Sequence, residues 1–331
     1  MDKETVEGPE RATLLERFVN LIPLPYLAGA ALIAALVGIA IYLALPIGAP
    51  ELNALVVSIQ VFYPFFAVRY MRQRIVESER ELLPLLPLGE TTWHRIFGKV
   101  SSPIPPVALA AILDLGALPP LYTAFESPTG FPLAVLIVAN AMIIWGFGTT
   151  IWVYSTCLWG LHRLGKEPLD LRSVYEDRMM GLRPVGSLSL SFVFVYFGSV
   201  LLGYTATLLQ RLNVAILGGV PLILAALVFF FLPLSSIHRQ MVQAKQRGLA
   251  SIRKQLEQLV KTSNPDGEPT GSELSVLKDL RAMMTLESAE RRVSALPTWP
   301  IDTSILSRLL AIVLSFTAIM LARIVQLLLR F

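Results

Sequence analysis

The sequence predicts an all-α protein, a polytopic bundle of transmembrane helices with a cytoplasmic helical hairpin. Three observations lead to this fold class. Hydrophobic residues make up 54% of the 331 residues and charged residues only 16%, whereas soluble domains carry roughly 25% charged residues. The apolar residues are gathered into blocks of about the 20 residues that a helix needs to cross a bilayer. Lysine and arginine are concentrated in the segments between alternate blocks.

Seven apolar blocks qualify as membrane spans. They lie at residues 26–48, 52–70, 103–124, 131–161, 185–209, 213–236 and 303–329. The first is too long for the apolar core of a secretory signal, so we interpret it as a permanent span. The fourth would be about 45 Å long at 1.5 Å per residue. Because the hydrocarbon core is about 30 Å thick, this helix is expected to tilt or to project into the cytoplasm.

The third block is the weakest of the seven. Prolines at positions 103, 105, 106, 119 and 120 interrupt it and leave a short clean helical stretch between them. Two topologies therefore stay open. If the block crosses the membrane, the chain has seven spans. If it re-enters on the side from which it came, the chain has six, and segment 162–184 falls on the opposite side.

The distribution of lysine and arginine orients the chain. The N-terminal segment holds 3 of these residues, segment 69–102 holds 6, segment 162–184 holds 5 and segment 237–302 holds 10, which is 24 of the 28. The turns at 46–51 and 125–130 hold none. With seven spans and a cytoplasmic N-terminus, every basic segment is cytoplasmic. The pattern predicts a multi-pass cell-membrane protein with its C-terminus outside.

Four parts of the chain follow from this topology. They are a cytoplasmic N-terminal segment (1–25), a transmembrane bundle (26–236), a cytoplasmic helical hairpin (237–302) and a last transmembrane helix (303–331). Both arms of the hairpin carry apolar residues at helical spacing, namely Val242, Leu249, Ile252, Leu256 and Leu259, then Leu274, Leu277, Leu280 and Met284. The turn chemistry of residues 264–267 separates the arms, and the first arm is expected to continue out of the sixth span.

A carboxylate lies in the middle of the third block. At bilayer depth Asp114 costs on the order of 2.5–3.5 kcal/mol, and such residues usually face a cavity or a partner. One hypothesis is an ion or proton site shared with Asn140 or Gln60. The alternative is a protonated, hydrogen-bonded carboxyl group with a structural role. Arg323, in the last span, either pairs with Asp114 or extends towards the headgroups.

The segment between the fourth and fifth spans is dense in charge, glycine and proline. Glu176, Asp177, Arg178 and Arg183 are candidates for a charged cluster at a pore mouth or a docking surface. The alternative is a short interfacial helix with solvated charges. Small residues at four-residue spacing, Ser187, Ser191, Ser199 and Gly203 in the fifth span and Ala34 and Gly38 in the first, predict tight helix contacts within the chain or between copies.

Several signatures of enzymes are absent from the sequence. It contains no phosphate-binding P-loop, no His-Glu-x-x-His zinc motif and no Gly-x-Ser-x-Gly elbow. Cys157 is alone, so neither an internal disulfide nor a cysteine-based metal site can form. The sequence therefore predicts no catalytic residues, no metal site and no cofactor.

Three stretches together are similar to uncharacterised polytopic membrane proteins of archaea and bacteria. They are the charged segment 162–186, Pro233-Leu234-Ser235-Ser236-Ile237-His238-Arg239-Gln240-Met241 at the end of the sixth span, and Leu296-Pro297-Thr298-Trp299-Pro300-Ile301-Asp302 before the last span. The resemblance covers about residues 160–330. It implies the same many-spanning topology and assigns no activity and no site residues.

Two functions stay open at this point. The first is a channel or transporter for ions or small solutes, suggested by the multi-span bundle, the proline-rich third block and Asp114. The second is a membrane-embedded interaction or signalling module that acts through the 237–302 hairpin. The expected partners are the lipid bilayer, a further copy of the chain through the small-residue faces, and a cytoplasmic protein at the hairpin. No nucleic acid partner is expected.

Overall fold

The computed structural model describes residues 12–44, 50–124, 130–172, 177, 179–209, 214–263 and 273–328. Within these residues the chain is helical without a strand, which confirms the all-α fold class. The α-helices are α1 (Leu14–Val19), α2 (Tyr26–Ala44), α3 (Pro50–Leu82), α4 (Glu90–Phe97), α5 (Ile104–Ala124), α6 (Phe131–Leu164), α7 (Arg183–Leu209), α8 (Val214–Ser263), α9 (Glu273–Ser294) and α10 (Thr303–Leu328). Short 3-10 turns, η2 (Leu83–Leu85) and η3 (Gly98–Ser101), flank α4.

Seven stretches of helix in the described residues are long and apolar enough to cross a membrane. They are Tyr26–Ala44, Ala54–Leu85, Glu90–Gly116, Phe131–Leu164, Arg183–Gly203, Pro221–Lys261 and Thr303–Ala322. Each overlaps one of the seven apolar blocks of the sequence. The chain is therefore a multi-pass membrane protein built from these helices.

Helix α5 is longer and more regular than the prolines of the third block suggest. It runs without a break for 21 residues, which is about 31 Å at 1.5 Å per residue and enough to cross the hydrocarbon core. Pro105 and Pro106 lie in its first turn, where a backbone N–H has no helical partner to lose. The helix also continues through Pro119 and Pro120. The expectation of a short broken helix is therefore wrong for the backbone of α5.

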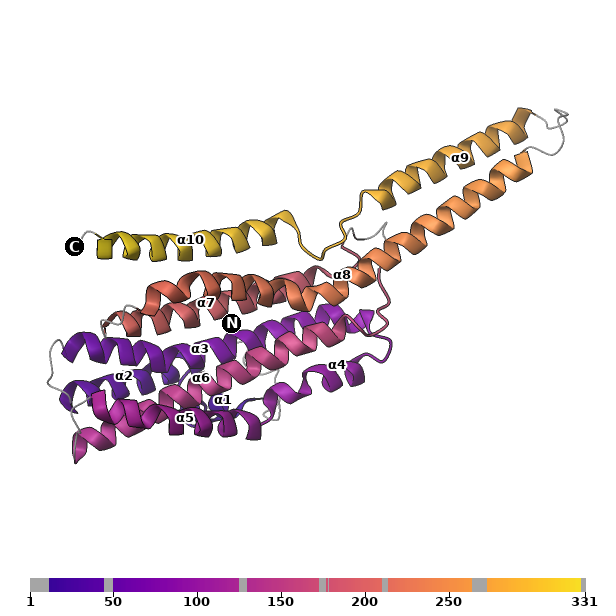
Figure 1. The fold of residues 1–331 in the computed structure, drawn as a ribbon. Helices are drawn as coiled ribbons and strands as arrows, with labels where there is room; N and C mark the ends of the chain where they lie inside the picture. Colours follow the sequence, from indigo (N-terminus) through magenta and orange to yellow (C-terminus); the bar gives the residue numbers. More distant parts are fainter. Residues whose placement is uncertain are drawn as a thin grey trace.

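Most of the long helices lie side by side (Figure 1), and lysine and arginine are concentrated towards one end of them. The C-terminal ends of α2, α5, α7 and α10 and the first residues of α3, α6 and α8 gather at one end of the bundle. The opposite end holds α4, the start of α7 and the base of the α8–α9 hairpin, which extends away from the bundle. The described lysines and arginines of segments 69–102, 162–184 and 237–302 belong to this second end.

Helix α3 is the packing centre of the bundle. It packs against α2, α6 and α7 and buries Phe65, Val68 and Met71 completely or nearly so. The α2–α3 approach depends on Gly38, because a Cβ atom there would lie 1.9 Å from Ser58 Oγ. The tight contact that the small residues of the first span predict is thus made within the chain.

Candidate functional site

The structure brings the two central intramembrane candidates together. Asp114 on α5 and Asn140 on α6 are both half-buried, and Asn140 Nδ2 donates a hydrogen bond of 2.6 Å to Asp114 Oδ1. The α5–α6 pair is close at Gly148, where a Cβ atom would lie 3.2 Å from the backbone nitrogen of Ala110. This close approach allows the short amide and carboxylate side chains to meet between the helices.

The other two intramembrane candidates belong to different helices. Gln60 is half-buried on α3, and among the described contacts no hydrogen bond joins it to Asp114 or Asn140. Arg323 belongs to α10, whose main packing partners are α7 and α8, whereas α5 packs along α6. The side chain of Arg323 lies outside the described part of the structure.

The two described candidates of the charged segment before α7, Asp177 and Arg183, make separate contacts. Asp177 accepts hydrogen bonds from the backbone nitrogens of Met179 (2.9 Å) and Gly181 (2.7 Å), so it shapes a local turn. Arg183 forms an ion pair of 3.0 Å with Asp302, in front of α10. The remaining two candidates, Glu176 and Arg178, lie outside the described residues.

A buried ion cluster joins α1 to α3, and the sequence-based prediction missed it. Glu16 is fully buried, and its Oε1 lies 2.8 Å from Arg72 Nε and 3.6 Å from Arg69 Nη1. Its Oε2 accepts hydrogen bonds from the backbone nitrogen (3.0 Å) and hydroxyl (3.1 Å) of Thr13. Both carboxylate oxygens are therefore bonded, which is the condition for burying a charge without a large penalty.

The α1 half of this ion cluster, Thr13 and Glu16, has a recognisable signal in the sequence. Thr13 and Glu16 have the Ser/Thr-x-x-Glu spacing of a capping box, and they form that box at the start of α1. The capping box predicts a short helix before the first span. It does not predict the partners, because Arg69 and Arg72 lie more than 50 residues further along the chain.

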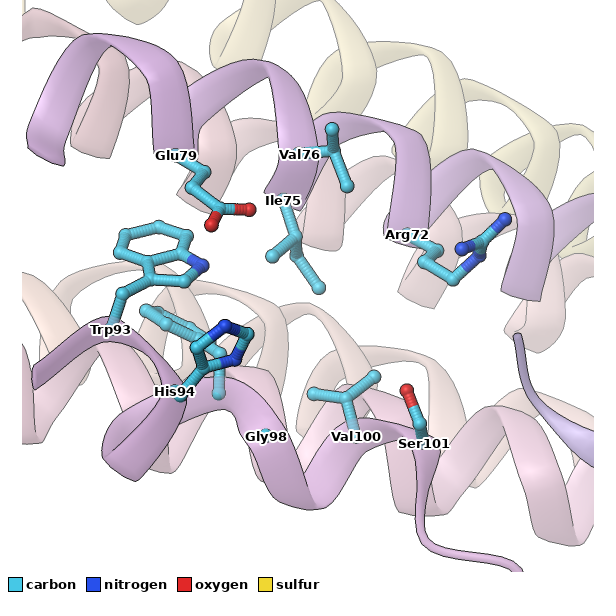
Figure 2. Close-up of a pocket in the computed structure, with 10 residues that line it drawn as sticks. Arg72, Ile75, Val76, Glu79, Trp93, His94, Gly98, Val100 and Ser101 are labelled. Carbon is cyan, nitrogen blue, oxygen red and sulfur yellow. The ribbon is translucent and has the colours of Figure 1, made fainter. Parts of the chain in front are cut away.

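Two cavities flank the ion cluster on α3. One, of about 390 Å³, lies between α3 and the α4–η3 segment, and Figure 2 shows Glu79 from α3 and His94 from α4 reaching into it. Arg72 and Ser101 line its other end, and Val76 lies on α3 between Glu79 and Arg72. The second, of about 310 Å³, lies between α2 and α3 and is lined by residues that include Arg69 and Gln73.

A compact junction fixes the base of the hairpin. The ring of His238 on α8 stacks on Trp299 at 4.3 Å between centroids, and its Nδ1 lies 2.6 Å from the carbonyl oxygen of Thr298. Because a carbonyl oxygen only accepts, Nδ1 carries the proton. Gln240 donates to the carbonyl oxygens of Gly165 (2.8 Å) and Glu167 (2.5 Å).

The junction unites three stretches that are far apart in the sequence. Segment 162–186 contributes Arg183 and Gly186, segment 233–241 contributes His238, and segment 296–302 contributes Trp299 and other residues. A Cβ atom at Gly186 would lie 2.0 Å from the carbonyl oxygen of Pro300, so the linker before α10 lies directly on the start of α7. These stretches therefore have a common structural role.

The arms of the hairpin pack on each other near its base. Val293 and Leu296 are buried together with Met180, and Leu249 and Ile252 of α8 pack against them. Arg253 and Glu290 form an ion pair of 3.0 Å across the arms. The three apolar residues Leu277, Leu280 and Met284 of α9 are 64%, 50% and 61% exposed, respectively.

Comparison with known proteins does not assign a function to these sites. Comparisons of the chain with protein-family models, with curated proteins and with solved structures found no match.

Proposed function

We propose that the protein is a membrane-embedded interaction module that holds a helical hairpin in a fixed position outside the membrane, where the hairpin docks a protein partner. The observation that carries this proposal is the continuity of α8. It is one helix of 50 residues, about 75 Å long at 1.5 Å per residue. Its first part is apolar enough to cross a membrane, and its second part forms the first arm of the hairpin.

The junction supports this proposal because it limits the freedom of the hairpin. The base of the hairpin is attached to the C-terminal cap of α6 through Gln240 and to the linker before α10 through the His238–Trp299 stack. The Arg183–Asp302 ion pair in turn attaches this linker to α7. Together these connections oppose rotation as well as bending. A docking arm that is fixed in this way loses little conformational entropy when it binds.

The exposed apolar row of α9 supplies the binding surface. Leu277, Leu280 and Met284 recur at three- and four-residue spacing, which places them on one side of the helix. Val293, on the opposite side of α9, is buried towards α8. An apolar row on an amphipathic helix is the feature that a helix-in-groove complex buries, so the partner is expected to offer an apolar groove or a second amphipathic helix.

Site-specific photocrosslinking in native membranes tests this function. A photoreactive residue at Leu280 is expected to form a discrete protein adduct, whereas the same residue at the exposed position Lys254 on α8 is not. The added substitution Leu277→Glu should remove the adduct without changing the melting temperature. Co-expressed copies with two different tags distinguish a second copy of the chain from another protein. Equal adduct formation at positions 280 and 254 would contradict the proposal.

The hydrogen bond between Asp114 and Asn140 favours a second candidate, ion or proton transport. A carboxylate with an amide partner inside a membrane span is the kind of group that marks an ion path. The test is ion flux into liposomes that contain purified protein. Transport predicts flux in the wild type, its loss in Asp114→Asn and its retention in Glu77→Gln, an exposed carboxylate outside the pair. The absence of flux from folded wild-type protein across several ions would reject transport.

A further inference from the structure

The cavity between α2 and α3 has the composition of a lipid-headgroup site. Its volume is about 310 Å³. Arg69 and Gln73 from α3 supply hydrogen-bond donors, while Leu27 from α2 and Phe66 from α3 supply apolar surface. The ring of Tyr70 completes one wall and stacks on Phe66, with 5.8 Å between the ring centroids. Polar donors and apolar surface thus meet in a single cavity.

The position of the cavity along the helices matches a membrane–water boundary. Tyr26 and Leu27 are the first two residues of α2, whose apolar stretch begins there. On α3, Phe66 precedes Arg69, and three more arginines follow before the helix ends at Leu82. Leu27 is 52% exposed, so the apolar side of the cavity is open to the hydrocarbon. Gln73, on the other side, is exposed towards the basic end of the bundle.

Arg69 keeps donor capacity for a ligand. Glu16 bonds closely to Arg72, whereas its distance to Arg69 is 3.6 Å, longer than a hydrogen bond. The other contact of the Arg69 guanidinium in the described part of the chain is with the face of Tyr26, 5.3 Å from the ring centroid. A guanidinium has five N–H donors in a planar fork that matches a phosphate. The side chain is 20% exposed, so a ligand in the cavity can reach it.

We propose that this cavity binds the phosphate of an anionic phospholipid from the leaflet at the basic end of the bundle. Arg69 and Gln73 donate hydrogen bonds to the phosphate, and an acyl chain lies along Leu27 and Phe66. One carboxylate, that of Glu16, faces both Arg69 and Arg72, and the lipid phosphate supplies a second negative charge. Basic pockets between transmembrane helices are suited to such headgroups because the charge is neutralised where the dielectric constant is low.

Binding of phosphatidylglycerol to the full-length protein in a neutral detergent tests the proposal, with native mass spectrometry as the readout. Wild type is expected to bind phosphatidylglycerol at least tenfold more tightly than phosphatidylcholine. Arg69→Gln should lower the affinity for phosphatidylglycerol at least tenfold. The matched control is Arg80→Gln, an exposed arginine near the end of α3 and outside the lining of the cavity, which should change the affinity for phosphatidylglycerol less than twofold.

A second variant separates lipid binding from damage to the ion cluster. Gln73→Leu leaves Glu16 and Arg69 in place and should lower the affinity about threefold or more at an unchanged melting temperature. Unchanged affinity in both Arg69→Gln and Gln73→Leu would overturn the proposal. Competition by inorganic phosphate at the same concentration as the lipid would also overturn it, because the site would then bind a free anion.

Discussion

Glu16 is the residue on which the attachment of α1 to the bundle depends. Its carboxylate is buried and contacts two arginines of α3 from a six-residue helix. Removing one partner of a buried ion pair leaves the other charge uncompensated, which costs about 3–5 kcal/mol. An ion pair at the surface contributes less than about 1 kcal/mol. The burial of Glu16 therefore determines how much its ion pairs contribute to the free energy of unfolding.

Neutralising this carboxylate is expected to destabilise the protein. Glu16→Gln preserves the shape of the side chain and should reduce the free energy of unfolding by about 3 kcal/mol, measured as a lower melting temperature of the purified protein. Glu77→Gln, which breaks the exposed Arg74–Glu77 pair, should change it by less than about 0.5 kcal/mol. Equal melting temperatures for the two variants would show that the cluster is not a stabilising contact.

Asp302 makes the junction sensitive to acid. The backbone N–H of Ile305 donates to its carboxylate at 2.7 Å, and with the nearby Arg183 this lowers the pKa of Asp302 below its usual value. A carboxylate with a lowered folded-state pKa stabilises the fold above its unfolded-state pKa. This contribution disappears as the pH falls through the folded-state pKa.

The expected result is a pH-dependent difference between wild type and Asp302→Asn. Wild type should melt at a higher temperature at pH 7. The difference should begin to shrink as the pH falls below about 4, the usual pKa of an aspartate, and should continue to shrink towards the lower folded-state pKa of Asp302. Melting curves of both proteins between pH 3 and pH 7 measure this difference. A difference in melting temperature that stays constant over the whole pH range would mean that the charge of Asp302 does not contribute to stability.

At the level of single residues, the sequence is most informative where chemistry alone marks a position. A carboxylate and an amide inside apolar blocks stand out, and Asp114 and Asn140 do lie in contact. Glu16 does not stand out, because it occurs in a polar segment among other charges. Its burial results from packing against α3, which no local pattern encodes. For the same reason the separate contacts of Asp177 and Arg183 could not be predicted from their closeness in the sequence.

At the scale of elements, helix α8 shows how much of a helix hydrophobic periodicity can predict. The sequence predicts both the sixth span and a helical arm that continues from it, and α8 runs through both. Pro221 and Pro233 lie inside this helix. Proline removes one hydrogen bond and favours a kink, but neighbouring helices in a bundle accommodate it. The prolines at the start of α5 were misleading for a different reason, because Pro105 and Pro106 lie in its first turn, where proline removes no helical hydrogen bond.

The junction is expected to determine the orientation of the hairpin. Trp299→Ala removes the ring that stacks on His238, so α8 should move more freely relative to the bundle. Nitroxide labels at Glu90→Cys on α4 and Lys254→Cys on α8 report the distance between bundle and hairpin by pulsed electron paramagnetic resonance. A narrow distance distribution is expected in the wild-type background and a broader one in Trp299→Ala.

Phe231→Ala provides the control for this measurement. Phe231 also contacts Trp299, at 5.6 Å between ring centroids, but it is partly exposed and lies seven residues before His238. The substitution Phe231→Ala should broaden the distance distribution less than Trp299→Ala does. The native Cys157 is fully buried, so it should not take up the label. Identical distributions in all three proteins would mean that the continuity of α8 alone fixes the hairpin.

At the scale of the whole molecule, the sorting of charge by position supports a single orientation. The ends of α2, α5 and α7 and the starts of α3, α6 and α8 gather at one end of the bundle. In the sequence, the turns between these helices contain no lysine or arginine except Arg211. The helices next to the basic segments gather at the other end. Positive residues favour the cytoplasmic side of a membrane. The proposed orientation therefore places α4, the junction and the hairpin in the cytoplasm.

Cysteine accessibility in intact cells tests this orientation together with the number of spans. Phe131→Cys lies at the exposed first residue of α6, and Lys254→Cys lies on the hairpin. With seven spans, a membrane-impermeant maleimide should label Phe131→Cys in intact cells and Lys254→Cys only after permeabilisation. If α5 re-enters instead of crossing, every later segment changes sides and the two labelling results are exchanged. That exchange would also place the hairpin outside the cell, where it could not dock a cytoplasmic partner.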